Sequence, residues 1–296
     1  MTLSVANDTM LLRAQDPHAL YEGADSAVPF YKKELPSPLS FAEPDTMAEL
    51  EQRLHLIMGR SIGELTQLSK LNAAAYATAK GFAGQLVELF LGAHAHNQSG
   101  PDFTKLGIEL KTVPVGFDLM PQEHTLICAA DLAPRHMIPF AQSALFHKMQ
   151  HMLFVMLLAP RNAGLSMGER RILGYFFFDL TGEHRQQVET DYNEMQELLL
   201  SHQFDQLTSS LGNVLQLRPR GLPGKDVVAV HDEEGQLIYT KTRGYYLRSS
   251  FTRTLLQSFI AEQGVDSEAL NQLQNFKKRL HLQEDDDDSA TNSDGE

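Results

Sequence analysis

An acidic residue followed by Glu-x-Lys on an apparent strand is the feature of this sequence with the clearest chemistry. In PDFTKLGIELKTVPV these residues are Asp102, Glu109 and Lys111. Because strand side chains alternate between faces, Glu109 and Lys111 share one surface. There a carboxylate can hold a divalent cation and an ammonium group can orient a water molecule, as phosphodiester hydrolysis requires. The pattern predicts a metal-dependent nuclease, although it also fits a half-buried strand that shows two solvated charges.

The helix predicted over 81–93 supplies a further carboxylate, that of Glu88. At about 100° per residue, Glu88 lies away from the apolar stripe of this helix. Its neighbours around the helix are three glycines, Gly81, Gly84 and Gly92. Because glycine is costly inside a helix, this face indicates the close approach of a nucleic-acid backbone or of a packed loop. An ordinary surface Glu on a loosened helix is the alternative.

Apolar periodicity places the other elements along the chain. Helices are predicted from about 46 to 57 and over 61–68, 182–202, 250–262 and 266–282. Strands are predicted near 107–115, 124–131, 152–158, 172–179, 214–218, 237–240 and 244–248. Strands and helices that neither alternate strictly nor segregate indicate an α/β or α+β core.

The ends of the chain differ from its middle in composition and charge. Residues 1–45 contain scattered prolines and little periodicity, which favours an extended arm. Residues 284–296 carry seven acidic side chains and no basic one, which predicts a disordered acidic tail. Of the formal net charge of −13, the acidic ends account for most. The acidic pI near 5.3 therefore does not argue against a nucleic-acid partner.

Cysteine usage and hydropathy bear on the compartment. A single cysteine, Cys128, excludes an intramolecular disulfide and suits a reducing compartment. Its apolar surroundings predict a buried structural thiol rather than a nucleophile. We see no segment of signal-peptide form and none long enough to span a membrane, so we expect a cytoplasmic protein.

Two other motifs are rejected. His147 and His151 lie four residues apart in HKMQH, but a lysine stands where a zinc protease has its glutamate. No P-loop and no Gly-x-Gly-x-x-Gly stretch appears in the sequence, so nucleotide binding is not indicated.

Five separated blocks resemble a known family, in its order and spacing. They are KGFAGQLVELFLGA, PDFTKLGIELKTVPV, LFHKMQHMLFV, VLQLRPRG and RGYYLRSSFTRTLL. The family is MutH, the strand-nicking endonucleases of methyl-directed DNA mismatch repair, and the resemblance covers about 46–262. It implies an α/β fold with a restriction-endonuclease-like core, a mixed central sheet flanked by helices, and two lobes that form a DNA cleft.

On this resemblance the chain divides into four parts. The arm of 1–45 precedes the endonuclease domain of 46–262. Within that domain we expect a catalytic lobe over about 46–145 and a recognition lobe over about 146–262. A C-terminal helix over 263–283 and the tail of 284–296 follow. The arm and the chain beyond about 263 exceed the family core, so the resemblance implies no function for them.

The resemblance assigns catalytic roles residue by residue. The family's catalytic carboxylates fall on Glu88, Asp102 and Glu109, and its catalytic lysine falls on Lys111. By this reading Asp102 and Glu109 ligate Mg²⁺, and Glu88 supports the metal site or a second ion. Lys111 would position or deprotonate the attacking water. Two further family lysines beside the site or the DNA match Lys80 and Lys148.

The resemblance also assigns base recognition. Family members recognise GATC and cut the unmethylated strand 5′ to the guanine, and their recognition residues match Arg218, Arg220 and Tyr246. Arginine can bind guanine O6 and N7 together, and an aromatic ring can sense an N6-methyl group on adenine. Two positions depart from the family pattern. Leu126 stands where a phenylalanine lies beside the DNA, and Arg220 stands where the family has lysine.

The leading hypothesis is therefore a Mg²⁺-dependent nicking endonuclease that acts as a monomer on hemimethylated GATC in double-stranded DNA. The implied protein partner is the ATPase MutL, with MutS acting indirectly. A restriction-type enzyme that cuts both strands at GATC is one alternative. A non-catalytic GATC-binding or partner-docking protein is the other. The carboxylate cluster argues against it, since it would repel DNA in the absence of metal.

Overall fold

The structure is a computed structural model that describes residues 42–69, 81–93, 100–161, 164–220, 226–263, 273, 275, 277 and 278. Most of the predicted N-terminal arm and the whole acidic tail lie outside these residues. Four residues of the helix expected over 266–282 are described, and they are helical. In the described part of the chain, no helix has the length and apolar character needed to cross a membrane.

The first sheet has the order β1-β3-β4. It contains β1 (Glu109–Val115), β3 (His151–Leu158) and β4 (Arg171–Asp179). β3 runs parallel to β1 and antiparallel to β4. The central strand β3 is apolar from Met152 to Leu158 and buried throughout this stretch. An unbroken apolar run is expected of a strand that is covered on both faces.

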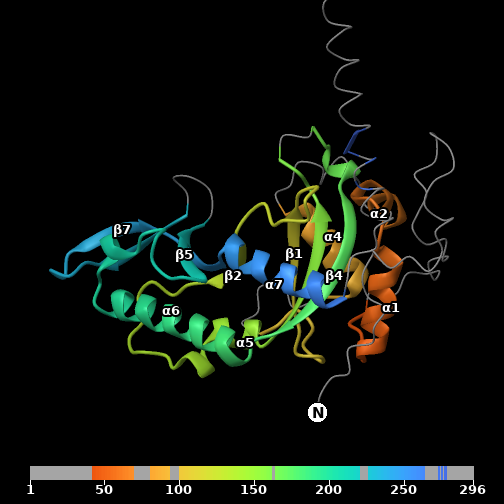
Figure 1. Ribbon diagram of the computed structural model, residues 1–296. Helices are drawn as coiled ribbons and strands as arrows, with labels where there is room; N and C mark the ends of the chain where they lie inside the picture. Colours follow the sequence, from red (N-terminus) through yellow and green to blue (C-terminus); the bar gives the residue numbers. More distant parts are fainter. Residues whose placement is uncertain are drawn as a thin grey trace, which may run out of the picture.

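Four helices lie around this sheet (Figure 1). They are α1 (Met47–Ile57), α2 (Ile62–Ser69), α4 (Phe82–Leu91) and α7 (Ser249–Gln263). α4 contacts β1, and α7 contacts β4 through the stacked rings of Phe176 and Phe259. The predicted capping box before α2 is confirmed, because Ser61 and Glu64 bind each other's backbone N–H groups at 3.1 and 2.6 Å.

The second sheet has the order β2-β8-β5 and is antiparallel throughout. Its strands are β2 (Thr125–Ala129), β8 (Arg243–Leu247) and β5 (Leu215–Pro219). A separate hairpin of β6 (Val227–His231) and β7 (Leu237–Lys241) connects β5 to β8. The long helix α6 (Gly182–Leu200) contacts β5, and the short α5 (Ala144–Met149) lies between the two sheets in Figure 1. Single 3₁₀ turns span Phe140–Gln142, Met167–Glu169 and Phe204–Gln206.

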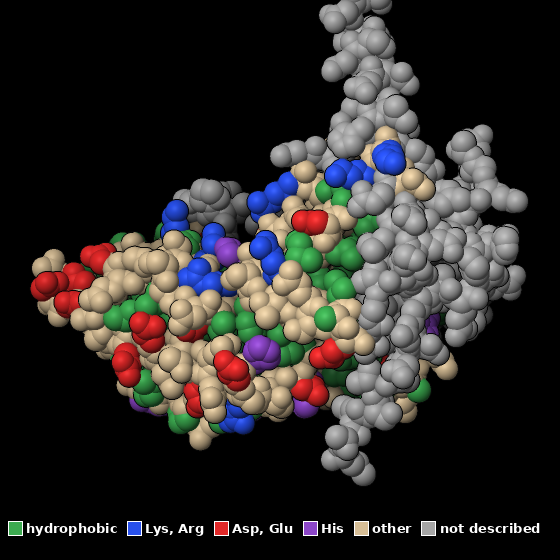
Figure 2. Space-filling model, viewed as in Figure 1, with side chains coloured by type: hydrophobic (Ala, Val, Ile, Leu, Met, Phe, Trp, Pro, Cys, Tyr) green, Lys and Arg blue, Asp and Glu red, His purple; other side chains and the backbone are tan. Residues whose placement is uncertain are grey.

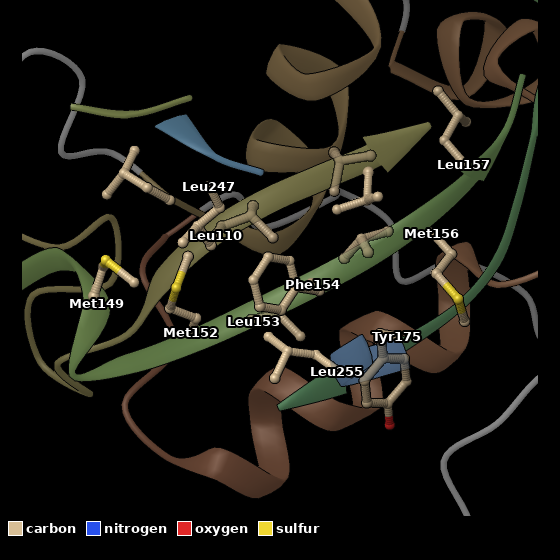
Figure 3. Close-up of a cluster of buried hydrophobic side chains, with 14 of the residues drawn as sticks. Leu110, Met149, Met152, Leu153, Phe154, Met156, Leu157, Tyr175, Leu247 and Leu255 are labelled. Atoms are coloured by element: carbon tan, nitrogen blue, oxygen red, sulfur yellow. The ribbon is translucent and has the colours of Figure 1, made fainter. Parts of the chain in front are cut away.

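One buried apolar cluster joins the two sheets. Figure 3 shows Leu110 of β1, Met152 to Phe154 of β3, Leu247 of β8 and Leu255 of α7 in this cluster. On α6 the predicted inward residues are buried, namely Val188, Tyr192, Met195 and Leu199. Because burial of apolar surface dominates folding, this shared core holds the two sheets in a defined relation.

The mixed α/β class predicted from the sequence is confirmed. β3 and β4 follow the predicted division near residue 145 in the chain but pair with β1, which precedes it. Conversely, β2 precedes it and pairs with β8. The chain thus crosses between the two sheets several times, and pairing between distant segments is not visible in local periodicity. β6 was also not predicted.

Candidate nuclease site

Asp102 lies in the turn before β1, where Phe103 and Ile108 form an isolated β-bridge. Its Oδ2 accepts the backbone N–H of Leu110 at 2.9 Å. β1 is an edge strand, and this N–H faces away from β3 because it bonds to the carboxylate. The hydrogen bond fixes the Asp102 carboxylate beside the strand that carries Glu109.

Glu109 is the most enclosed member of the site, with only 1% of its surface exposed. Nζ of Lys111 lies 2.5 Å from its Oε1, so the two side chains share one surface as the strand alternation predicts. Nζ of Lys148 lies 2.9 Å from Oε2 and 3.1 Å from Oε1. The structure therefore brings two ammonium groups onto one buried carboxylate.

Lys148 reaches this carboxylate because α5 ends directly before β3, the strand next to β1. Ser143 caps α5 by accepting the N–H of Phe146 at 3.0 Å. Leu145 and Met149 anchor the buried face of the helix, on which Lys148 also lies. Of the two family lysines expected near the site, the structure places Lys148 within it. The other, Lys80, lies outside the described residues.

The charges at this site act against one another. Burial raises the pKa of Glu109, the Lys111 ammonium lowers it, and the negative charge of Asp102 raises it. The net result is a pKa of Glu109 above its ordinary value. This balance shows that Asp102 lies close enough to Glu109 to act on it, so a cation between the two carboxylates would relieve their repulsion.

Glu88 is half-buried on α4, four residues after Gly84. It therefore shares the helix face of Gly84, which lies toward Thr112 of β1. Across the described residues, no three acidic, histidine or cysteine side chains gather closely enough to hold a metal ion. Among the described residues, the structure thus brings Asp102 and Glu109 together without a third ligand of this kind, and the role of Glu88 stays a prediction.

Two of the three glycines around Glu88 lie at the ends of α4. Gly81 and Gly92 are its caps, both with positive φ. A Cβ at Gly92 would lie 2.2 Å from the carbonyl oxygen of Ala42, so the packed loop is the correct reading at this position. A Cβ at Gly84 would make only ordinary contact with Thr112.

The predicted recognition residues lie on the second sheet. Arg218 of β5 donates from Nη1 to Oε1 of Gln216 at 3.1 Å. Tyr246 is half-buried on the central strand β8, where its Cα pairs with Leu126 on one side and Gln216 on the other. Arg220 is exposed just beyond β5. The structure brings these residues to one sheet, and it leaves their roles as predictions.

Two residues of this sheet were not singled out from the sequence. Gln216 is buried between apolar neighbours in LQL, and a buried polar residue in such a strand is the signal that would have found it. At Gly244 a Cβ would lie 2.7 Å from the side chain of Leu126 and 2.8 Å from the carbonyl oxygen of Cys128. Glycine therefore allows β2 to approach β8 closely, and only the structure shows this need.

Surface charge is divided in Figure 2. Lys and Arg side chains gather along the upper side of this face, over the region of β5, β2 and β1. Asp and Glu side chains lie mainly at the far end, near β7, and along the lower side, although acidic atoms are also visible among the basic ones. A negatively charged polymer fits the upper side, despite the acidic composition of the chain as a whole.

The two histidines of the rejected zinc motif do not lie on one helix. His147 belongs to α5, whereas His151 begins β3 and binds Asp179 through Nδ1 at 2.8 Å. Cys128 is the thiol that the sequence predicts to be structural, and burial raises its pKa to about 11. Neither feature adds a second reactive centre to the described residues.

Comparison with known proteins gives consistent results. A family model described as DNA mismatch repair enzyme MutH matches residues 91–191. The chain is 34% identical to the DNA mismatch repair protein MutH of Shewanella baltica (strain OS195) over 214 residues, which are 72% of this chain and 95% of the relative. It is also 34% identical to that of Vibrio cholerae (strain O395) over 220 residues, 74% of this chain and 98% of the relative. Similarity of this extent shows that the chain belongs to the MutH family, the DNA-binding endonucleases of mismatch repair.

Proposed function

We propose that the protein is a Mg²⁺-dependent endonuclease that nicks the unmethylated strand of hemimethylated GATC sites, 5′ to the guanine. The observation that carries this proposal is the buried carboxylate of Glu109, held by Lys111 and Lys148 beside Asp102. Such a cluster is costly to bury and contributes little to stability, so a chemical role explains it better than a structural one.

The donor set suits Mg²⁺. Carboxylate oxygens are its preferred protein ligands, and one or two of them suffice when a substrate phosphate completes the coordination. Asp102 and Glu109 would hold the ion, with Glu88 as the further carboxylate that the family pattern implies. Bound there, Mg²⁺ would stabilise the negative charge that develops on the phosphate oxygens.

The lysines account for the rest of the chemistry. Lys111 carries its ammonium beside Glu109. It would orient the attacking water, or accept its proton after losing its own. Lys148 neutralises the same carboxylate from the other side and would pair with a DNA phosphate once that carboxylate turns to another cation. Both ammonium groups also lower the repulsion between the site and the DNA backbone.

Base recognition is proposed for the second sheet. Arg218 and Arg220 would bind guanine, and Tyr246 would sense the methyl group on adenine. Two lobes, each built around one sheet, would form a cleft for the DNA. The shared core supports this arrangement, since it fixes the distance between the reading residues and the cutting residues.

The proposed setting is the cytoplasm, at the nucleoid, with activation by MutL after MutS has found a mismatch. The proposed enzyme acts as a monomer with one site, so that it nicks rather than breaks the duplex. An enzyme that cuts both strands needs a second site, and the described residues contain one such cluster.

The decisive experiment uses a hemimethylated GATC duplex with each strand labelled separately. With Mg²⁺ the wild type should nick only the unmethylated strand, and MutL with ATP should raise the rate. Asp102→Asn and Lys111→Met should reduce nicking by about 10³-fold or more, as loss of metal or of the positioned water requires. Lys105→Met changes an exposed lysine of the same loop and is the control.

Each alternative has its own outcome in this assay. Cleavage of both strands in wild type would support the restriction-type enzyme. GATC binding without metal-dependent cleavage would support the non-catalytic protein. Full activity of Asp102→Asn would remove the proposed site while leaving the family assignment intact.

A further inference from the structure

Two opposite charges hold the loop before β5 from its two sides. Asp191 lies on α6 and is 1% exposed. Its Oδ2 accepts the backbone N–H groups of Val214 at 2.7 Å and Leu215 at 2.8 Å, and both of its oxygens lie 2.9 Å from the nitrogen of Asn213. Three successive amides therefore point at one buried carboxylate, which replaces the water that this charge has lost.

The carbonyl side of the same loop is held by Arg248, which follows β8. Its Nε donates to the carbonyl oxygen of Gly212, and its Nη2 donates to those of Ser209 and Leu211, each at 3.0 Å. The backbone N–H of Arg248 donates to the carbonyl oxygen of Val214 at 2.9 Å. The loop is thus bound through its amides to α6 and through its carbonyls to the end of β8.

Gly212 shows how closely the loop wraps the carboxylate. Its φ is +77°, in the region that favours glycine. A Cβ at this position would lie 2.2 Å from the carbonyl oxygen of Leu215 and 3.2 Å from Cγ of Asp191. The turn has no room for a side chain, so the position of the carboxylate and the path of the backbone determine each other.

The held segment leads directly into the proposed reading strand. Leu215, the last amide bound by Asp191, is the first residue of β5 and is followed by Gln216 and Arg218. At about 3.3 Å per residue, Arg218 lies about 10 Å further along an extended strand. A shift or tilt at the anchor would therefore be passed on to the guanidinium, which needs defined geometry to bind one base.

We infer that Asp191 and Arg248 are positioning residues for DNA sequence recognition, which set β5 and hence Arg218 in register with the bases. This inference rests on the proposed function. It assigns neither residue to contact with DNA. It states that the sequence preference of the nuclease depends on a buried carboxylate on α6 and a guanidinium at the end of β8.

The test compares single-turnover nicking of a GATC duplex with that of a duplex changed at one base pair. Asp191→Asn keeps the shape of the side chain but replaces one acceptor oxygen with an NH₂ group that faces a backbone N–H. We expect the ratio of the two rates to fall by about tenfold, the discrimination that one well-placed base contact supplies. Arg248→Gln, which removes the carbonyl-side donors, should lower the ratio in the same way.

Two variants serve as matched controls. Glu194→Gln removes an exposed carboxylate from α6, and Arg253→Gln removes an exposed guanidinium from α7, and both should keep the wild-type ratio. A merely structural role would reduce the folded fraction and lower both rates together, leaving the ratio unchanged. Circular dichroism measures that fraction, and Arg248→Gln decides the question if Asp191→Asn does not fold.

The possible outcomes distinguish failure of this inference from failure of the proposed function on which it rests. If wild type shows no preference for GATC, the proposed function fails and this inference fails with it. If wild type prefers GATC and folded Asp191→Asn and Arg248→Gln keep the same ratio, only the inference is overturned. An equal loss of preference in Glu194→Gln would overturn it as well.

Discussion

Lys148 binds both carboxylate oxygens of Glu109, at 2.9 and 3.1 Å, from a helix that lies 39 residues further along the chain. An ammonium group from α5 thus forms an ion pair with the carboxylate that is proposed to bind metal. The two cations compete for one ligand, so loading of the metal must displace or share this contact. Pairing with a DNA phosphate offers the lysine another partner, which would couple metal binding to DNA binding.

Lys148→Met should therefore separate metal binding from catalysis. Without DNA, we expect Mn²⁺ to bind about tenfold more tightly than to wild type, because its competitor has been removed. Nicking should nevertheless fall. Titration calorimetry measures the affinity directly, with Lys105→Met as the control for a lost surface charge. Unchanged or weaker Mn²⁺ binding would show that Lys148 does not compete for the site.

Tyr246 is half-buried on the central strand β8, where it pairs with Gln216 of β5. This position leads to a prediction on the sensing of methylation. Tyr246→Ala should narrow the difference in nicking rate between hemimethylated and fully methylated GATC by about tenfold, the value of one base contact. Nicking rates on both duplexes test this. An unchanged ratio would remove Tyr246 from methyl sensing, whatever its effect on the rate itself.

His124 links the start of β2 to α7. Its Nδ1 accepts the backbone N–H of Ser249 at 2.9 Å, so this nitrogen must carry no proton. Burial and the charges of Arg218, Arg248 and Arg161 lower the pKa of His124. Because the pKa of His124 is lower in the folded state, neutral His124 stabilises the fold above the unfolded pKa of about 6.5. This stabilisation is lost as the pH falls from that value through the lower pKa of the folded state.

His124→Asn should weaken that pH dependence, since the amide oxygen can accept the same N–H and does not titrate. We expect the fall in Tm between about pH 7 and about pH 5 to be smaller in this variant than in wild type. Thermal unfolding followed by circular dichroism measures both. His136→Asn, at an exposed histidine, should behave like wild type, and an equal effect there would contradict the assignment.

Cys128 should be slow to react in the native state. Burial raises the pKa of its thiol to about 11. At about pH 8 its thiolate is then ~100-fold scarcer than in the unfolded chain. A disulfide reagent should therefore modify the native protein at least that much more slowly than the protein in denaturant. Equal rates would show an open and acidic thiol. Because the chain has one cysteine, no other group contributes to the signal.

Gln196 and Tyr245 form a buried polar pair between α6 and β8. Nε2 of Gln196 donates to the tyrosine hydroxyl at 2.7 Å. Tyr245→Phe should cost about 1–3 kcal/mol of unfolding free energy, because it leaves a buried donor without a partner. Adding Gln196→Met should recover part of the loss, since both polar groups are then gone. Denaturant unfolding of the two single variants and the double variant measures the coupling.

Local patterns predicted most elements of the fold. The unbroken apolar run of β3, the shared surface of Glu109 and Lys111 on β1 and the capping box at Ser61 are short-range signals, and each is confirmed. β6 was missed because Val227 and Ala229, on its exposed face, are apolar, so the sequence shows no alternation of apolar and polar residues, although burial alternates along the strand. The hairpin had only one strand in the sequence-based prediction.

What the sequence could not predict was which segments meet. The parallel pairing of β1 with β3 joins segments that are separated by β2, and no local signal reports it. The same pairing brings Lys148 to Glu109. Asp191 is a second example of what the sequence could not predict, because in the sequence it is one acid among several on a polar helix. Its three amide partners appear only once the chain has folded.

The edge of β1 has a consequence for how the protein behaves in a crowded cell. An open edge strand is a template on which other chains can add and aggregate. Here the Asp102 carboxylate covers the N–H of Leu110, and a returning segment covers the far end through the N–H of Gln122 on the carbonyl oxygen of Pro114. A carboxylate proposed to bind metal thus also shields this edge from self-association. Variants that remove it are expected to lose solubility as well as chemistry.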